Sequence, residues 1–203
     1  ERYGGMEASF TYLVAGLESL AKADAGFALA VGIHGTVCDG LRRFAGEAIL
    51  DEVLEDLIAG RKIAAFALSE AGSGSDAKAL RTTWRPDGDR VVLRGSKYWI
   101  TNGLDADLFF VLARGADDRS SAFLVDGEGG ETFTRAKIAD KMGVRASNTA
   151  ELIFDDHSIP ADRMIGEEGT GFKIAMSTLD KGRLAVASGC VGIVQGCLET
   201  AVE

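Results

Sequence analysis

The chain has 203 residues, of which 46% are hydrophobic and 26% charged, and its formal net charge is −9. This composition is typical of a soluble globular protein with enough apolar material for a core, and it excludes extensive disorder. The negative charge argues against a general surface for nucleic acid or anionic membranes, because both attract cationic proteins. No apolar run approaches the roughly 20 residues that span a bilayer, and no signal-peptide pattern opens the chain. We expect no nucleic-acid or membrane partner.

Residues 1–62 are predicted to form a helical domain. Apolar residues recur at helical spacing from Ser9 to Gly60 and divide into three groups, which predicts three helices. Asp24 is placed to cap the second helix, and Gly60 to end the third. The chain opens at Glu1 without an initiator Met and enters structured-looking sequence at once, so we expect the natural start to be missing.

Residues 63–160 are predicted to form a middle domain of antiparallel strands, as a barrel or a sandwich. Turn signals lie at residues 86–88, 115–118 and 127–130, at the spacing of a small all-β unit. The predicted strands are 63–68, 79–84, 90–93, 98–101, 108–112, 121–125, 132–138 and 151–154.

Residues 161–203 are predicted to begin a second helical domain. One helical pattern runs from Phe172 to the end of the chain and contains Gly182, Gly189, Gly192 and Gly196. Each glycine costs up to about 1 kcal/mol relative to Ala in a helix. Since residues three or four apart share a helix face, we expect close helix packing at Gly189, Gly192 and Gly196.

The stretch from Ile63 to Gly103 carries the strongest functional signal. A buried strand delivers the loop Ser69–Asp76, whose small side chains leave backbone N–H groups and the hydroxyls of Ser69, Ser73 and Ser75 free to bind an anion or a ring oxygen. The antiparallel path that follows is expected to bring Trp99 back beside this loop. Each feature alone is weak evidence, because a glycine-serine loop is most often a plain turn and a Trp in a strand most often belongs to the hydrophobic core.

Together these segments resemble a known family. Phe66–Asp76 and Lys97–Gly103 resemble the two signature segments of the acyl-CoA dehydrogenases. Ser69 stands where the family usually has Thr, and Ala71 where it usually has Pro. Further landmarks follow in family order, at residues 141–145, 150–156, 159–160, 166–172 and 179–183.

The resemblance implies an α+β multi-domain fold, with a helical N-terminal layer, the middle β domain and the start of a C-terminal helical bundle. It implies FAD-dependent α,β-dehydrogenation of an acyl-CoA thioester to a trans-2-enoyl-CoA, in the catabolism of fatty acids or of branched-chain or aryl acyl groups. An electron-transfer flavoprotein is the implied electron acceptor, and the implied assembly is a homotetramer or a dimer. The implied setting is a bacterial cytoplasm, or a mitochondrial matrix if the source is eukaryotic.

The family's functional positions carry over onto this sequence one by one. Phe66, Leu68 and Ser69 would lie along the flavin ring, Trp99 and Ile100 would pack near it, and the Thr101 hydroxyl would meet the flavin N5. Gly74 and Ser75 would serve the pyrophosphate, with Ser75 also close to CoA. Asp180 and Arg183 would hold CoA, although Arg183 is also typical of a surface or helix-end cation.

No catalytic carboxylate is assigned within the 203 residues. In most family members the base is a Glu that would fall beyond Glu203, and in a minority it would stand at the position of Gly182. Gly182 either serves close packing or leaves room for an acyl chain. We also predict no metal site, because the three cysteines and His34 and His157 lack ligand spacing.

Two other classes of function remain open at this stage. One is a flavoprotein of the same fold with another role, such as an acyl-CoA oxidase or a damage-response relative. The other is a non-catalytic subunit that binds acyl-CoA or flavin.

Overall fold

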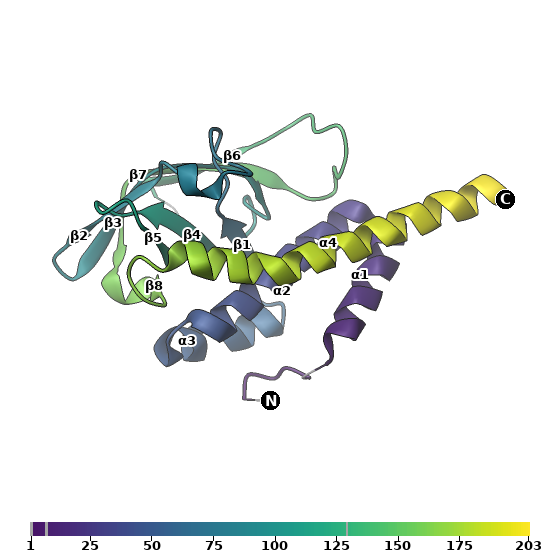
Figure 1. Cartoon of the computed structure of the whole chain (residues 1–203), viewed down its shortest axis with the longest axis horizontal. Helices are drawn as coiled ribbons and strands as arrows, with labels where there is room; N and C mark the ends of the chain where they lie inside the picture. Colours follow the sequence, from purple (N-terminus) through teal and green to yellow (C-terminus); the bar gives the residue numbers. More distant parts are fainter. Residues whose placement is uncertain (1, 7, 129) are drawn as a thin grey trace.

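The structure is a computed structural model that describes residues 2–6, 8–128 and 130–203. Glu1, which opens the predicted first domain, Glu7, and Gly129 of the predicted turn 127–130 lie outside the described residues. A curved β sheet forms one side of the molecule, and helices α2 (Ala25–Phe44), α3 (Glu47–Ile58) and α4 (Gly171–Val202) cover one of its faces (Figure 1). The long helix α4 extends past the sheet and carries the C-terminal end away from it.

The three predicted N-terminal helices are confirmed as α1 Phe10–Ala23, α2 Ala25–Phe44 and α3 Glu47–Ile58. Asp24 caps α2 as expected, because its carboxylate accepts a hydrogen bond from the Phe27 backbone N–H at 2.8 Å. After α3 the chain reverses at Gly60, which has a φ of +70° and so takes a conformation that glycine adopts at no steric cost.

Within the described residues, eight strands form one sheet. They are β1 Ala64–Ala67, β2 Thr83–Asp87, β3 Arg90–Thr101, β4 Leu108–Arg114, β5 Ser120–Asp126, β6 Phe133–Lys137, β7 Thr149–Pro160 and β8 Met164–Ile165. The order is β6-β7-β3-β2-β4-β5-β8, and β1 pairs with β4. The α+β architecture is confirmed, but the sheet is mixed rather than wholly antiparallel, since β1 runs parallel to β4.

Several strand boundaries differ from the predicted ones. Residues 77–79 form a short 3-10 helix in place of the start of a strand, and Pro86 lies inside β2. The predicted strands 90–93 and 98–101 are one strand, because the chain continues through Gly95 along β7. A Cβ at Gly95 would lie 2.7 Å from the Thr82 Cα, so this glycine serves a close approach of two segments rather than a turn.

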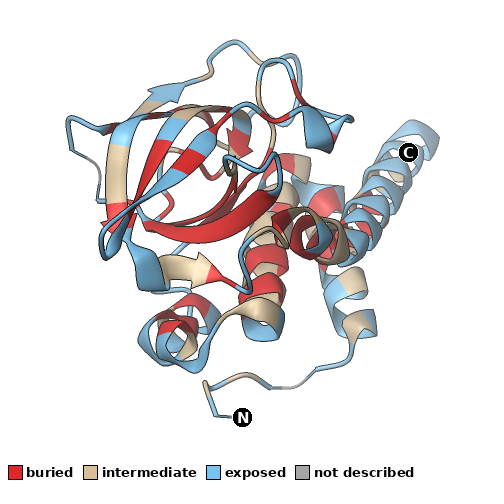
Figure 2. Cartoon of the chain, turned by 60° about the vertical axis from the view of Figure 1, so that its left-hand side comes forward, coloured by how far each residue is buried: buried red, intermediate tan, exposed pale blue. Residues whose placement is uncertain are grey.

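The core has two parts that share the central strands. One lies between the sheet and helices α2, α3 and α4, and includes Phe66 and Phe110. The other lies inside the curve of the sheet and includes Phe109 and Phe133 (Figure 2). Strands β1, β4 and β5 are buried on both faces, which explains why residues 64–67, 108–113 and 122–125 are continuous apolar runs rather than alternating patterns.

Helix α4, Gly171–Val202, packs against α1 and α2. A Cβ at Gly192 would lie 2.0 Å from the Glu18 carbonyl oxygen of α1, and one at Gly196 would lie 3.1 Å from the Lys22 carbonyl oxygen. The prediction of close packing is therefore confirmed at these two glycines. At Gly189 the contact is looser, because a Cβ would lie 3.6 Å from the Ala21 Cβ.

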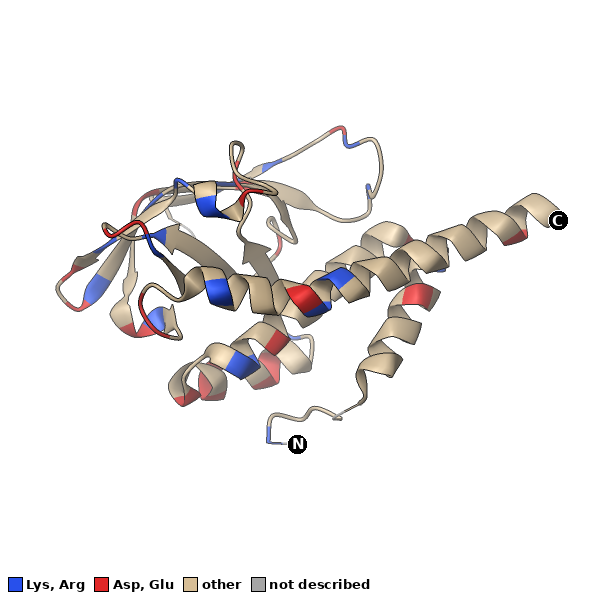
Figure 3. Cartoon of the chain, in the orientation of Figure 1, with Lys and Arg blue, Asp and Glu red and all other residues tan. Residues whose placement is uncertain are grey.

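Helix α4 is also long and apolar enough to cross a membrane by length and composition, and among the described residues it is the one helix that meets this test. Core helices of soluble proteins, which are mostly buried, meet the same test; 17% of the most apolar 18 residues of α4 are buried in this chain. Its charges gather in the first half, and Glu199 is the only charge between Arg183 and Val202 (Figure 3).

The contacts at Gly192 and Gly189 predict opposite effects on stability when each glycine is replaced by alanine. Gly192→Ala should lower the free energy of unfolding by about 1–3 kcal/mol, because the new Cβ forces α1 and α4 apart. Gly189→Ala has room and should be neutral or raise stability by up to about 1 kcal/mol through helix propensity. Urea unfolding followed by circular dichroism measures both, and equal effects of the two variants would contradict the packing described for Gly192.

Candidate functional site

Strand β1 delivers the loop 68–76 against strand β3. The Tyr98 backbone N–H donates to the Ser69 carbonyl oxygen at 2.8 Å. The loop also closes on itself, because the backbone groups of Glu70 and Ser73 exchange two hydrogen bonds of 2.9 and 3.1 Å. The expected approach of the loop to the Trp99 segment is therefore confirmed, and the loop is anchored at both the strand and its own turn.

A buried ion pair lies beneath this loop. The Lys97 side chain is 0% exposed, and its Nζ donates to Glu70 Oε1 at 2.7 Å and to the Leu68 carbonyl oxygen at 3.2 Å. The Glu70 carboxylate also accepts the backbone N–H groups of Arg81 at 2.6 Å and Thr82 at 3.0 Å. The pair thus joins strand β3, the loop and the segment that leads into β2.

The two charges of the pair have shifted pKa values. Burial alone would raise the pKa of Glu70, but the Lys97 ammonium and the two backbone N–H donors outweigh it, so this pKa is lowered. Burial lowers the pKa of Lys97 to about 8, against the attraction of the Glu70 carboxylate. This pair was not predicted from the sequence. The sequence signal for it was that one signature segment contains Glu70 and the other contains Lys97.

Trp99 is held with its indole outward. Its φ is +62°, a backbone conformation that is costly for a bulky residue, and its pairing with β7 is interrupted between Lys97 and Ile100. The side chain is 56% exposed, whereas the neighbouring Ile100 side chain is buried inside the sheet. Thr101 is half-buried and pairs with Thr149 of β7. The irregularity therefore directs the indole away from the core.

The other predicted flavin positions divide into buried and exposed ones. The side chains of Phe66 and Leu68 lie in the core between the sheet and the helices. Their backbone groups, rather than their side chains, are therefore what these residues contribute at the loop. Gly74 and Ser75 are exposed at the tip. The Ser73 hydroxyl is used within the loop, since it donates to the Asp76 carbonyl oxygen at 2.7 Å.

The predicted CoA residues lie on helix α4. Arg183 donates to Asp180 at 2.7 Å across one helical turn, and both side chains are largely exposed. Between them Gly182 is buried, and a Cβ there would lie 3.3 Å from the Thr36 hydroxyl of α2. Asp180 and Arg183 thus face solvent while Gly182 faces α2.

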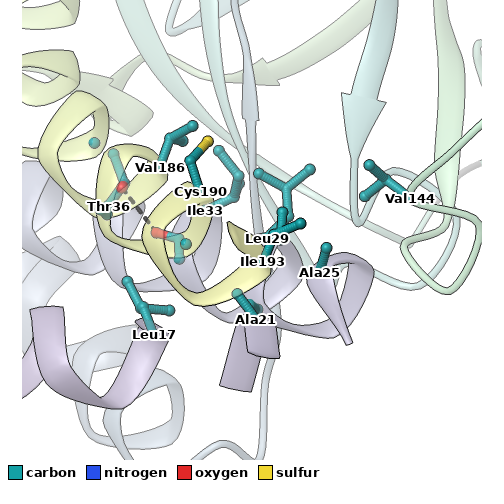
Figure 4. A pocket seen from close by; sticks show the side chains of 15 residues that line it. Leu17, Ala21, Ala25, Leu29, Ile33, Thr36, Val144, Val186, Cys190 and Ile193 are labelled. Carbon is teal, nitrogen blue, oxygen red and sulfur yellow. Dashed lines mark hydrogen bonds between the residues drawn. The ribbon is translucent and has the colours of Figure 1, made fainter. Parts of the chain in front are cut away.

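Gly182 borders an apolar cavity of about 160 Å³ between α1, α2 and α4. Figure 4 shows side chains of Leu17, Leu29, Ile33 and Ile193 around it. The lining residues include no carboxylate and no other charged side chain. The Thr36 hydroxyl donates to the Gly32 carbonyl oxygen at 2.8 Å, so it is satisfied within α2. This cavity suits a small apolar group.

No group of three or more His, Cys, Asp or Glu side chains could hold a metal ion within the residues described here.

Comparison with known proteins assigns the family. The acyl-CoA dehydrogenase N-terminal domain matches residues 1–61, the acyl-CoA dehydrogenase middle domain matches residues 65–157, and the acyl-CoA dehydrogenase C-terminal domain matches residues 169–203. The chain belongs to the acyl-CoA dehydrogenase family, as its two signature segments indicated.

Individual relatives agree with this assignment. The short-chain specific acyl-CoA dehydrogenase of Megasphaera elsdenii is 41% identical over the whole chain, which covers 55% of that protein. The solved structure of butyryl-CoA dehydrogenase from Megasphaera elsdenii superposes with a TM-score of 0.95 at 38% identity, covering 99% of this chain and 55% of that one. A glutaryl-CoA dehydrogenase from Mycobacterium smegmatis, solved in complex with FADH2, gives 0.93 at 32% identity, with 98% and 51% covered. The chain spans about half the length of these relatives.

The buried pair predicts a specific loss of stability in acid. The pKa of Glu70 in the folded protein is lower than its ordinary value of 4.5. Glu70 therefore contributes stability that is fully present above pH 4.5 and is lost as the pH falls through the lower pKa of the folded state. Below that pH the Lys97 ammonium is left buried without a counter-charge. The urea midpoint of the wild type should therefore fall more steeply below pH 4.5 than that of Glu70→Gln.

Asp156→Asn is the matched control, because Asp156 pairs with Arg94 of the same strand β3 at the same distance of 2.7 Å but at the surface. Its acid profile should follow the wild type. Parallel profiles for the wild type and Glu70→Gln would show that Glu70 does not carry this stability.

Proposed function

We propose that the full-length protein is an FAD-dependent dehydrogenase that converts an acyl-CoA thioester to its trans-2-enoyl-CoA. The observation that carries this proposal is the loop 68–76 joined by a hydrogen bond to the strand that presents Trp99. Family membership and the names of the relatives support it. We keep the domain division 1–62, 63–160 and 161–203 as part of the proposal.

The residues of the loop and of strand β3 fit a flavin. The exposed indole of Trp99 offers a flat apolar face, the backbone N–H groups of the loop offer donors, and the small, exposed Gly74 and Ser75 leave space for a phosphate to approach the backbone. In this assignment Phe66, Leu68, Ser69, Ile100 and Thr101 border the ring through backbone or hydroxyl groups. FAD, when bound, accepts the hydride that leaves the β-carbon of the acyl group.

We place the acyl chain in the cavity beside Gly182, and CoA along Asp180, Arg183 and Ser75. The cavity has a volume of about 160 Å³ and an apolar lining, which suits a short, branched or aryl acyl group. As the family resemblance implies, we assign the base that removes the α-proton to a Glu beyond Glu203. Desolvation in such an apolar site raises the pKa of a carboxylate and so improves it as a base.

The proposed partners follow from the family. They are an electron-transfer flavoprotein as acceptor and further copies of the same chain in a tetramer or dimer, with neither nucleic acid nor a membrane involved. The proposed setting is a bacterial cytoplasm or, in a eukaryote, the mitochondrial matrix.

An anaerobic titration of the full-length protein with straight, branched and aryl acyl-CoAs tests the activity. One chain class should bleach the absorption band of the oxidised flavin, which would establish dehydrogenation and the substrate class together. A yellow protein that no acyl-CoA bleaches would contradict the proposal in favour of a non-catalytic relative. Rapid reoxidation by air after bleaching would instead favour an acyl-CoA oxidase.

The assignment of the cavity predicts the effect of a larger residue at Gly182. Gly182→Val should lower kcat/KM for the preferred acyl-CoA by about tenfold or more, because even one methylene in an apolar pocket changes discrimination by this amount. The loss should be smaller for a shorter acyl group. Ala187→Val adds similar bulk on an exposed face of α4 that does not line the cavity, and it should leave kcat/KM unchanged. Equal loss for all chain lengths would contradict the cavity assignment.

A further inference from the structure

The Lys97 ammonium lies directly behind the peptide with which the loop begins. It is fully buried, and 3.2 Å separates its Nζ from the Leu68 carbonyl oxygen. The same peptide unit carries the Ser69 N–H on its other side. We propose that the buried Lys97–Glu70 pair is a positioning device for the flavin, which fixes and polarises the Leu68–Ser69 peptide so that its N–H becomes a stronger donor. The inference rests on the proposed function.

The geometry accounts for the fixing. Lys97 holds the Leu68 carbonyl, and the neighbouring Tyr98 N–H holds the Ser69 carbonyl at 2.8 Å. Two consecutive carbonyls of the loop are therefore bound by two consecutive residues of β3. With both carbonyls held, the plane of the peptide between them cannot rotate freely, and the direction of the Ser69 N–H is set before any ligand arrives.

The charge accounts for the polarisation. A cation that binds the carbonyl oxygen of a peptide draws electron density toward it and strengthens the N–H of the same unit as a donor, because hydrogen bonds in series polarise one another. The effect is stronger in a region without water than in solution, because charges there are less screened. A donor aimed at the edge of a ring that gains negative charge on reduction favours the reduced form.

Glu70 makes the buried cation possible. It supplies the counter-charge at 2.7 Å and is itself held by the Arg81 and Thr82 N–H groups, on the segment that follows the loop. A buried pair is weak grounds for stability alone, since desolvation offsets most of the attraction. Two neutral side chains joined by a hydrogen bond could hold the loop in the same shape. The presence of a buried charge therefore points to a functional role of the Lys97 ammonium at the site.

Three variants of the full-length protein test this inference. Lys97→Met removes the cation, and Lys97→Met with Glu70→Gln removes both charges without leaving one buried alone. Arg94→Met is the control, because it breaks an exposed pair of the same 2.7 Å distance on the same strand. The measurements are the affinity of the FAD-free protein for FAD, the reduction potential of the bound flavin, and the urea midpoint of the FAD-free protein.

We expect Lys97→Met to weaken FAD binding up to about tenfold, the range of a neutral hydrogen bond, because the Ser69 N–H is then less well placed and a weaker donor. The reduction equilibrium should shift about tenfold toward oxidised flavin, which is about 30 mV for a two-electron couple. The double variant should regain the urea midpoint lost in Lys97→Met but keep the lowered potential. Arg94→Met should match the wild type in FAD affinity and in potential.

A potential that returns to the wild-type value in the double variant, or that never changes, would overturn the inference and leave the pair a purely structural one. In that case acyl-CoA would still bleach the flavin, and the proposed function would stand. A wild-type protein that takes up no flavin would overturn the proposed function and this inference together.

Discussion

The structure of the site depends on a lysine that has no contact with water. Lys97 ties the end of β1 to β3 through the Leu68 carbonyl, and through Glu70 it ties both to the segment that precedes β2. Loss of one partner from such a buried pair typically costs about 3–5 kcal/mol, because the remaining charge has no compensation. Between Ser69 and Asp76 the loop is small and polar and Ser73 is its one buried residue, so side-chain packing contributes little to its shape. The ion pair and its hydrogen bonds therefore fix the shape of the loop, as side-chain packing fixes the other segments of the chain.

The rest of the fold supplies a rigid base for this pair. Strand β1 is buried on both faces, since its residues alternate between the core under the helices and the core inside the sheet. Helix α2 packs against both the sheet and α4, and Gly40 lets the Thr178 side chain of α4 come close. The same helix supplies Thr36 and Gly32 to the cavity beside Gly182. The loop with Trp99 and the apolar cavity are thus attached to one continuous packed body.

The sequence predicts most of the architecture, because helical periodicity and capping chemistry are local. Asp24 and Gly60 identify helix boundaries through interactions within a few residues. The strand pattern was less readable. Gly95 has the appearance of a turn but is an irregularity inside a long strand, and the parallel pairing of β1 with β4 depends on contacts distant in the sequence.

The predicted site was found through resemblance rather than through pattern. A loop of glycine and serine next to a Trp is not specific by itself, and the positive φ that turns Trp99 outward leaves no mark in the sequence. The burial of Lys97 was equally hidden, because lysine is almost always exposed unless it is paired. Its partner is 27 residues away, and only the folded sheet brings the two together.

The central claim is that the ion pair, and not the bound cofactor, shapes the loop. Native-state hydrogen exchange of the FAD-free protein tests it most directly at the Arg81 and Thr82 amides, which donate to Glu70. If the claim holds, these amides exchange as slowly without FAD as amides in the core strands β4 and β5, and added FAD changes them little. Fast exchange that slows only when FAD binds would contradict the account, because the cofactor would then be what orders the loop.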